Sequence, residues 1–209
     1  MSLALMPFGL IAVFASRESA HVNRLRHEAE ARAVATASAA AISETLSPGT
    51  LGLRLAMNDI VASATEHPID RVQCDLRLAS VIARYKAVSG LGMFNRNGRA
   101  ICTTPGFQTG PVYHPSSDIG YEVRLDASKK IILTTVASSR EDYFGVAEFR
   151  AATIAKLLPP PHDDAKPGIS LLQGSQAITL AAEQINNPLD QIVRVVVPVA
   201  SGQLGLEMR

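Results

Sequence analysis

The stretch 90–104 reads GLGMFNRNGRAICTT and predicts two antiparallel strands joined by a tight turn. Residues 90–95 form a short apolar run, and residues 100–103 form the returning strand. Asn97-Gly98 lies between the two runs, and this dipeptide is the strongest short hairpin signal in a sequence. We therefore expect an antiparallel sheet to begin near the middle of the chain.

The residues after this hairpin extend the sheet and then predict a second one. Three further strands, with short polar connections between them, are expected at 121–125, 131–138 and 143–149. A helix over 150–158 is expected to close this unit. A stiff Pro-rich linker, 159–168, leads to four more short strands, at 169–173, 176–180, 192–197 and 203–208. About 40 residues are marginal as a separate domain, so the second unit is expected to dock on the first.

The residues before the hairpin are helical in pattern. The segment 17–46 contains no Gly or Pro, and eight of the thirteen residues at 29–41 are alanine, the strongest helix former. A helix of this length spans about 45 Å. Val22, Leu25 and Ala29 form only a narrow apolar stripe beside charged residues. We expect the helix to pair with a second copy of itself, the alternative being that it lies along its own sheet.

Two shorter helices are expected between the long helix and the hairpin. Ser47-Pro48-Gly49 is expected to end the long helix, because Pro and Gly interrupt helical patterns. A second helix follows over 51–65. Asp70 is a plausible N-cap for a third helix over 71–85. The inner face of this third helix is predicted to consist of Val72, Leu76, Ala79 and Ala83.

Residues 1–16 carry no charge and are mostly apolar, and three interpretations fit them. They are the end of a transmembrane helix, the core of a signal peptide cleaved after Val13-Phe14-Ala15, or an ordinary buried helix. A membrane-spanning helix needs about 20 such residues, so this run is short for one. A signal peptide requires basic residues before its apolar core, and none precedes this run. We favour the end of a transmembrane helix.

Composition excludes several classes of function. The 20 basic and 19 acidic residues are balanced, which argues against a nucleic-acid surface. Cys74 and Cys102 are too few for a disulfide scaffold or a closed zinc site. In an exported protein they most simply form one disulfide, the alternative being two buried thiols. His162-Asp163-Asp164 lacks metal-ligand spacing, and no convergent catalytic group is found, so we expect no metal, no cofactor and no enzymatic activity.

Several short motifs together resemble a known family of domains. The chain is similar to a Cache-type (extracellular PAS-like) sensor domain, and more narrowly to the periplasmic part of alphaproteobacterial sensor histidine kinases. The resemblance covers about residues 17–158, and the last 50 residues would be a reduced second lobe. It rests on Cys74-Asp75-Leu76-Arg77, Leu91-Gly92-Met93-Phe94 with the Asn-Gly turn, Ile101-Cys102-Thr103-Thr104, and Tyr143-Phe144-Gly145-Val146.

The resemblance implies an α+β fold in which a long N-terminal helix carries a PAS-like five-stranded antiparallel sheet, with a smaller C-terminal β-rich lobe. It also implies that Cys74 and Cys102 are neighbours in space. The chain departs from the family in lacking Trp and any kinase region. The expected parts are a membrane or signal segment, a stalk helix, the sensor domain, the linker and a membrane-proximal lobe, at 1–16, 17–47, 48–158, 159–168 and 169–209.

In such domains a small ligand is held between one face of the sheet and the loop over it. That loop is 104–120 here, and its 17 residues are long for a connection. The ligand-binding residues predicted on this basis are Tyr113, His114, Ser116 and Tyr121. Arg124 is set aside, because strand alternation places it on the opposite face from Tyr121 and because Glu122 or Asp126 would pair with it.

The sequence therefore predicts the periplasmic ligand-sensing region of a two-component histidine kinase at the inner membrane. Binding of an unidentified small molecule would be relayed through the N-terminal helix to a cytoplasmic output. The expected partners are the membrane, through that helix, and a second copy of the chain, with no nucleic acid. The alternative is a ligand-free PAS-like module for dimerisation or protein docking.

Overall fold

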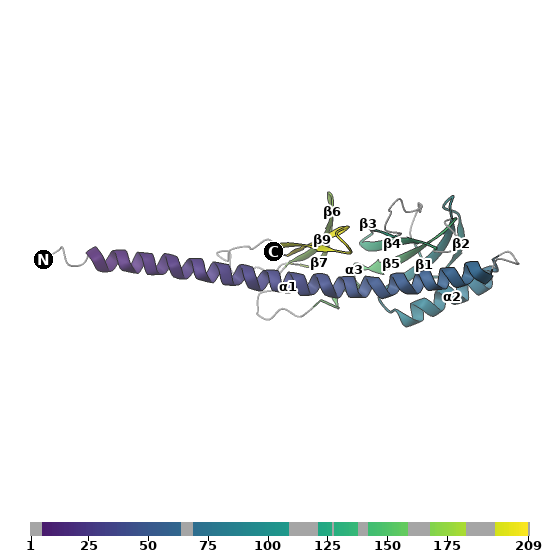
Figure 1. Cartoon of the computed structure of the whole chain (residues 1–209), viewed down its shortest axis with the longest axis horizontal. Coiled ribbons are helices and arrows are strands. Elements are labelled where there is room, and N and C mark those ends of the chain that lie inside the picture. The colour runs from purple at the N-terminus through teal and green to yellow at the C-terminus, as the bar shows by residue number, and fades with distance from the viewer. Residues whose placement is uncertain are drawn as a thin grey trace.

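The computed structural model describes residues 6–63, 69–108, 121–126, 128–137, 142–158, 168–182 and 195–208, with side chains from residue 16 onward. One helix, α1 (Met6–Ser63), forms a rod along which both sheets lie (Figure 1). Its 58 residues correspond to about 87 Å. Among the described residues, no helix has the length and apolarity needed to span a bilayer.

The prediction that the long helix ends at Ser47-Pro48-Gly49 is wrong, because α1 continues through Pro48 and includes the segment expected as a second helix. Proline in a helix interior removes a hydrogen bond and costs about 3 kcal/mol. Tertiary packing outweighs this cost, since Leu46 and Leu53 are buried on either side of Pro48. The division of the chain at residue 47 stays a prediction.

The five-stranded sheet has the predicted antiparallel form. Its strand order is β2-β1-β5-β4-β3, so the last strand lies in the centre (Figure 1). Gly98, at φ 76°, lies in the turn of the first hairpin, and its N–H donates to the Asn95 carbonyl. The strands are β1 (Val88–Asn95), β2 (Ala100–Thr103), β3 (Tyr121–Asp126), β4 (Lys130–Val136) and β5 (Tyr143–Arg150).

The C-terminal lobe is a second antiparallel sheet, which confirms the predicted β-rich unit. Its strand order is β7-β6-β9-β8. A short helix, α3 (Ala151–Ala155), follows β5 and is about half the length expected. The four strands are β6 (Ile169–Gln173), β7 (Gln176–Ala181), β8 (Val195–Val199) and β9 (Leu204–Met208).

Glycines bring α1 close to the five-stranded sheet. A side chain at Gly145 would collide with Met57 and Leu53 of α1. A Cβ on Gly49 would lie 3.0 Å from the ring of Phe149. The missing side chains therefore let the helix lie directly against β5.

The helix α2 (Arg71–Arg84) packs through a different face from the one predicted. Its buried residues are Cys74, Leu78 and Val81. Val72 and Leu76 of the predicted inner face are 65% and 60% exposed. Both faces of α2 are apolar at helical spacing, so periodicity alone cannot choose between them.

Candidate ligand site on the outer face of the five-stranded sheet

The two faces of the five-stranded sheet have different surroundings. The inner face carries Leu91, Leu133 and Phe149, which belong to the large core that α1 and α2 share. Strand alternation and the pairing register place a second set on the opposite side, which we call the outer face. Its central members are Gly90, Gly92, Phe94, Ile132, Thr134, Phe144, Val146 and Glu148.

A small aromatic cluster occupies the outer face, separate from the main core. The rings of Phe94 and Phe144 stack with centroids 5.5 Å apart and planes 19° apart. Ile132 and Val146 are buried beside them. Phe107 belongs to the segment after β2 and is only half-buried. Its ring centroid lies 5.5 Å from that of Phe94. The cluster is thus a second, smaller buried core on this side of the sheet, with the half-buried Phe107 at its edge.

The segment 104–108 lies directly on the outer face and starts the long loop expected over the ligand. The Thr104 side chain accepts a hydrogen bond from the Leu91 N–H at 2.9 Å. A Cβ on Gly90 would lie 2.8 Å from the Cα of Phe107, so only glycine fits beneath the segment. The Gln108 N–H donates to Glu148 Oε1 at 2.9 Å. The first part of the loop is therefore held in place by the strands under it.

A buried ion pair supplies this anchor. Glu148 is 0% exposed, and its Oε2 lies 2.9 Å from Nζ of Lys130, whose side chain is 12% exposed. A buried carboxylate is costly unless it is paired and hydrogen-bonded, and here Glu148 has both kinds of partner. The pair therefore adds polarity to one end of the outer face without adding net charge.

Thr134 is the polar group beside the aromatic cluster. It lies between Val146 of β5 and Glu122 of β3 in the pairing register and is 1% exposed. Its hydroxyl has no hydrogen-bond partner among the described residues. Buried hydroxyls usually have such a partner. Arg124 and Glu122 lie nearby on the edge strand, with Nε and Oε1 3.7 Å apart.

The predicted ligand-binding residues are only partly described. Tyr113, His114 and Ser116 lie outside the described residues. Tyr121 shares the inner face with Val123 and Leu125, and its hydroxyl is 2.7 Å from that of Ser201 in the second lobe. The structure therefore brings Arg124, not Tyr121, to the outer face. A ligand-binding role for Tyr121 stays an untested prediction.

Sequence reasoning did not single out Phe107, Lys130, Thr134 or Glu148. Alternation along 130–136 was available as a signal, since it places Lys130 and Thr134 on one face. The pairing of Lys130 with Glu148 depends on the register between β4 and β5, which a single sequence does not give.

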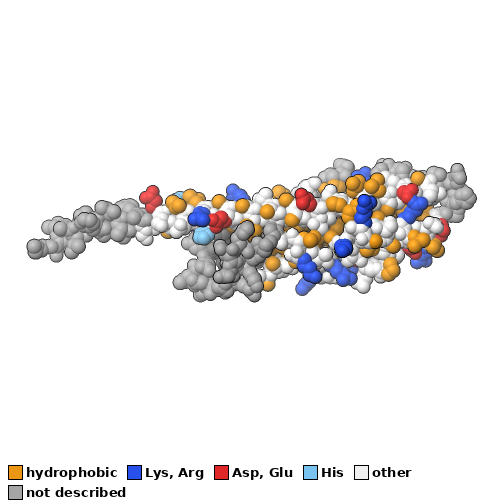
Figure 2. Space-filling model, turned by 90° about the horizontal axis from the view of Figure 1, so that it is seen from below, with side chains coloured by type: hydrophobic (Ala, Val, Ile, Leu, Met, Phe, Trp, Pro, Cys, Tyr) orange, Lys and Arg blue, Asp and Glu red, His pale blue; other side chains and the backbone are white. Residues whose placement is uncertain are grey.

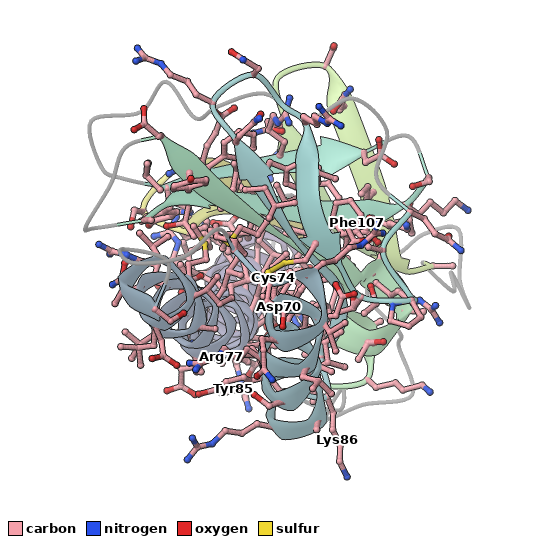
Figure 3. The ribbon with its side chains drawn as sticks, turned by 90° about the vertical axis from the view of Figure 1, so that its right-hand side faces the viewer. Asp70, Cys74, Arg77, Tyr85, Lys86 and Phe107 are labelled. Carbon is pink, nitrogen blue, oxygen red and sulfur yellow. A yellow bond between two sulfur atoms is a disulfide. The ribbon has the colours of Figure 1, made fainter. Side chains whose placement is uncertain are left out.

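The predicted disulfide between Cys74 and Cys102 is present and joins α2 to the edge strand β2 (Figure 3). Their Cα atoms are 6.0 Å apart, and both residues are buried. One residue along, Asp75 Oδ1 accepts the Thr103 N–H at 3.2 Å. These two links hold the strand from which the segment 104–108 starts. Within the described part of the chain, no His, Cys, Asp and Glu cluster has the makings of a metal site.

Comparison with known proteins gives a likeness of fold. No family model matches the chain, and no curated protein sequence matches it significantly. Among solved structures, it is similar to the extracellular domain of rpHK1S-Z16, a protein assigned as a histidine kinase. The TM-score is 0.57 at 14% identity, over 90% of this chain and 95% of that one.

Proposed function

We propose that this chain is the extracytoplasmic sensing region of a membrane-bound histidine kinase. The observation that carries the proposal is the fold likeness to a histidine kinase extracellular domain, which covers 90% of this chain. The sequence resemblance to Cache-type sensor domains points the same way. On this proposal the region is periplasmic, α1 leads to the inner membrane, and the chain itself is not catalytic.

The outer face is the proposed ligand site. It combines the buried hydrophobic cluster around Phe94, with Phe107 at its edge, with the Thr134 hydroxyl and with Arg124 on the edge strand. Such a mixture suits a small molecule that has an apolar body and a few hydrogen-bonding groups. Binding there would alter the packing of β4 and β5, and β5 lies directly against α1. A ligand that prefers one arrangement of β5 would bias the position of α1.

A thermal-shift panel tests the proposed site. Carboxylates, amino acids, sugars and purines are added to the purified chain, and a binder raises the unfolding temperature by mass action. For a ligand that bonds the Thr134 hydroxyl, Thr134→Val is expected to weaken affinity about two- to tenfold. Thr179→Val, on an exposed strand position of the second sheet, is the matched control and leaves affinity unchanged. A panel without any stabilising compound counts against a ligand sensor.

We also propose that α1 pairs with a second copy of the chain. Val22 and Leu25 are 57% and 52% exposed on α1, and Leu51 and Leu55 are exposed further along. Figure 2, seen from below the view of Figure 1, shows hydrophobic side chains interspersed with charged ones on that face of the molecule. The same exposed residues fit the alternative function, a ligand-free dimerisation or docking module. The thermal-shift panel distinguishes the two, because the alternative predicts no binder.

Sedimentation equilibrium tests the pairing. The parent chain is expected to dimerise, and Leu25→Glu is expected to raise the dimer dissociation constant at least tenfold, because it places a charge in the apolar contact. Asn23→Glu adds the same charge two residues away and is the control. A parent chain that stays monomeric at high concentration would overturn the pairing.

A further inference from the structure

The edge strand β3 has backbone groups that lie outside its pairing with β4 and face the second sheet. Its residues Glu122, Arg124 and Asp126 pair with β4 together with their neighbours, in a continuous antiparallel register. The N–H groups of Val123 and Leu125, and the carbonyl of Val123, form their hydrogen bonds outside that register. An edge strand normally exposes such groups to solvent or to another strand. Here two glutamine side chains meet them instead.

Gln203 and Gln173, both from the second lobe, bond to the edge of β3 through their side-chain amides. Gln203 Oε1 accepts the Val123 N–H at 2.6 Å, and Gln173 Oε1 accepts the Leu125 N–H at 2.9 Å. Gln173 Nε2 donates to the Val123 carbonyl at 2.7 Å, and Gln203 Nε2 donates to that of Tyr121 at 3.3 Å. Each glutamine therefore both accepts from β3 and donates to it, as a neighbouring strand would.

The turn that presents Gln203 has an unusual backbone. Ala200, Ser201 and Gly202 have φ angles of 51°, 58° and 83°, and the first two are not glycine. Residues other than glycine seldom hold this conformation unless the surroundings impose it. The turn is tied on two sides, since the Ser201 hydroxyl bonds that of Tyr121 and the Ala200 N–H lies 3.5 Å from Ser43 Oγ of α1. The turn conformation is thus maintained by contacts with β3 and α1.

We infer that Gln173 and Gln203 are positioning residues that clasp β3 and couple the five-stranded sheet to the second sheet. Along β3, the clasped residues Val123 and Leu125 alternate with Glu122 and Arg124, which belong to the outer face. A displacement of the outer face that moves β3 must therefore move or break the glutamine contacts. The coupling is a property of the fold and holds whether or not a ligand binds the outer face.

Hydrogen exchange on the whole chain tests the contacts themselves. Gln173→Met and Gln203→Met keep side-chain length and remove the amide. Exchange at the Leu125 and Val123 N–H groups, respectively, is expected to rise at least tenfold. Exchange at the Arg124 N–H, which lies in the register with β4, stays the same. Gln176→Met, at an exposed position of β7, is the matched control.

A second measurement tests coupling and not merely structure. Ile132→Val weakens the outer face and is expected to speed the slowest amide exchange in β4 and β5 about two- to tenfold. In the parent chain the amides of Leu171 and Leu206 should speed up by the same factor. In the Gln173→Met/Gln203→Met background, adding Ile132→Val should leave the exchange rates of these two amides unchanged.

Two outcomes overturn the inference, and neither depends on a ligand. If Ile132→Val in the parent chain leaves amide exchange in the second sheet unchanged, the sheets are independent. This result does not require any glutamine variant to fold. Second-sheet exchange that still follows Ile132→Val in the double glutamine variant shows that contacts other than the two glutamines couple the sheets. A thermal-shift panel in which no compound binds would count against the proposed sensor and would leave the inference about Gln173 and Gln203 unaffected.

Discussion

The bond between Cys74 and Cys102 allows a worked prediction of stability. It closes a loop of sequence separation 28, and on the chain-entropy model this constraint contributes about 3.6 kcal/mol at 25 °C. Domains of this kind unfold with about 5–15 kcal/mol, so the bond supplies a large share of the total. Replacing both cysteines by alanine is therefore expected to lower the free energy of unfolding by about 3–5 kcal/mol, since both buried sulfur atoms also leave small voids.

Urea denaturation of the oxidised chain and of Cys74→Ala/Cys102→Ala measures this difference. The urea m-value of the variant should rise slightly, because an unfolded chain without the cross-link exposes more surface. Cys74→Ala alone should lose nearly as much stability as the double variant, since either change breaks the link. The reasoning is refuted if the double variant loses less than about 1 kcal/mol. It is also refuted if alkylation of the purified oxidised chain without reductant labels both thiols.

Four further substitutions test the packing and are measured by denaturant unfolding. Gly145→Ala should lower stability by about 1–3 kcal/mol, because the new methyl group meets α1, and an unchanged value would contradict that close contact. Asp70→Ala should cost about 1 kcal/mol, since Asp70 Oδ1 caps α2 by accepting the Val72 N–H at 3.0 Å. Lys130→Met should cost about 3 kcal/mol by removing the ion-pair partner of a buried carboxylate, and adding Glu148→Leu should restore much of it. Pro48→Ala should raise stability by about 2 kcal/mol, and a loss would show that Pro48 is needed where it lies.

The sheets were more predictable from the sequence than the helices. β2 and β6 have the bounds expected from their apolar runs and turn residues, because those signals are local. Pro48 misled the prediction, since a helix can continue through proline when buried residues such as Leu46 and Leu53 hold both sides. The inner face of α2 was also mispredicted. What selects Cys74, Leu78 and Val81 over the equally apolar Val72 and Leu76 is contact with α1, β1 and β2.

The site was predictable to the level of a sheet face and a loop, but not of residues. Alternation separates Tyr121 from Arg124, but it does not say which of them faces the covering loop. That choice follows from where α1 and the second sheet pack. Gln173 and Gln203 illustrate the same limit. A glutamine at a strand end is expected to be solvated, and its bond to the backbone of β3 depends on how the two sheets pack.

The position of Pro48 gives a physical reason for the two sheets to be linked twice. Ser43, before Pro48, reaches the turn of the second sheet, whereas Gly49 lies against Phe149 of the five-stranded sheet. The hydrogen bond that Pro48 cannot donate makes α1 weakest between these two contacts. A helix that yields at this point would leave the sheets free to drift apart if it were their only link. The glutamine contacts on β3 provide a second link between the sheets that does not depend on α1.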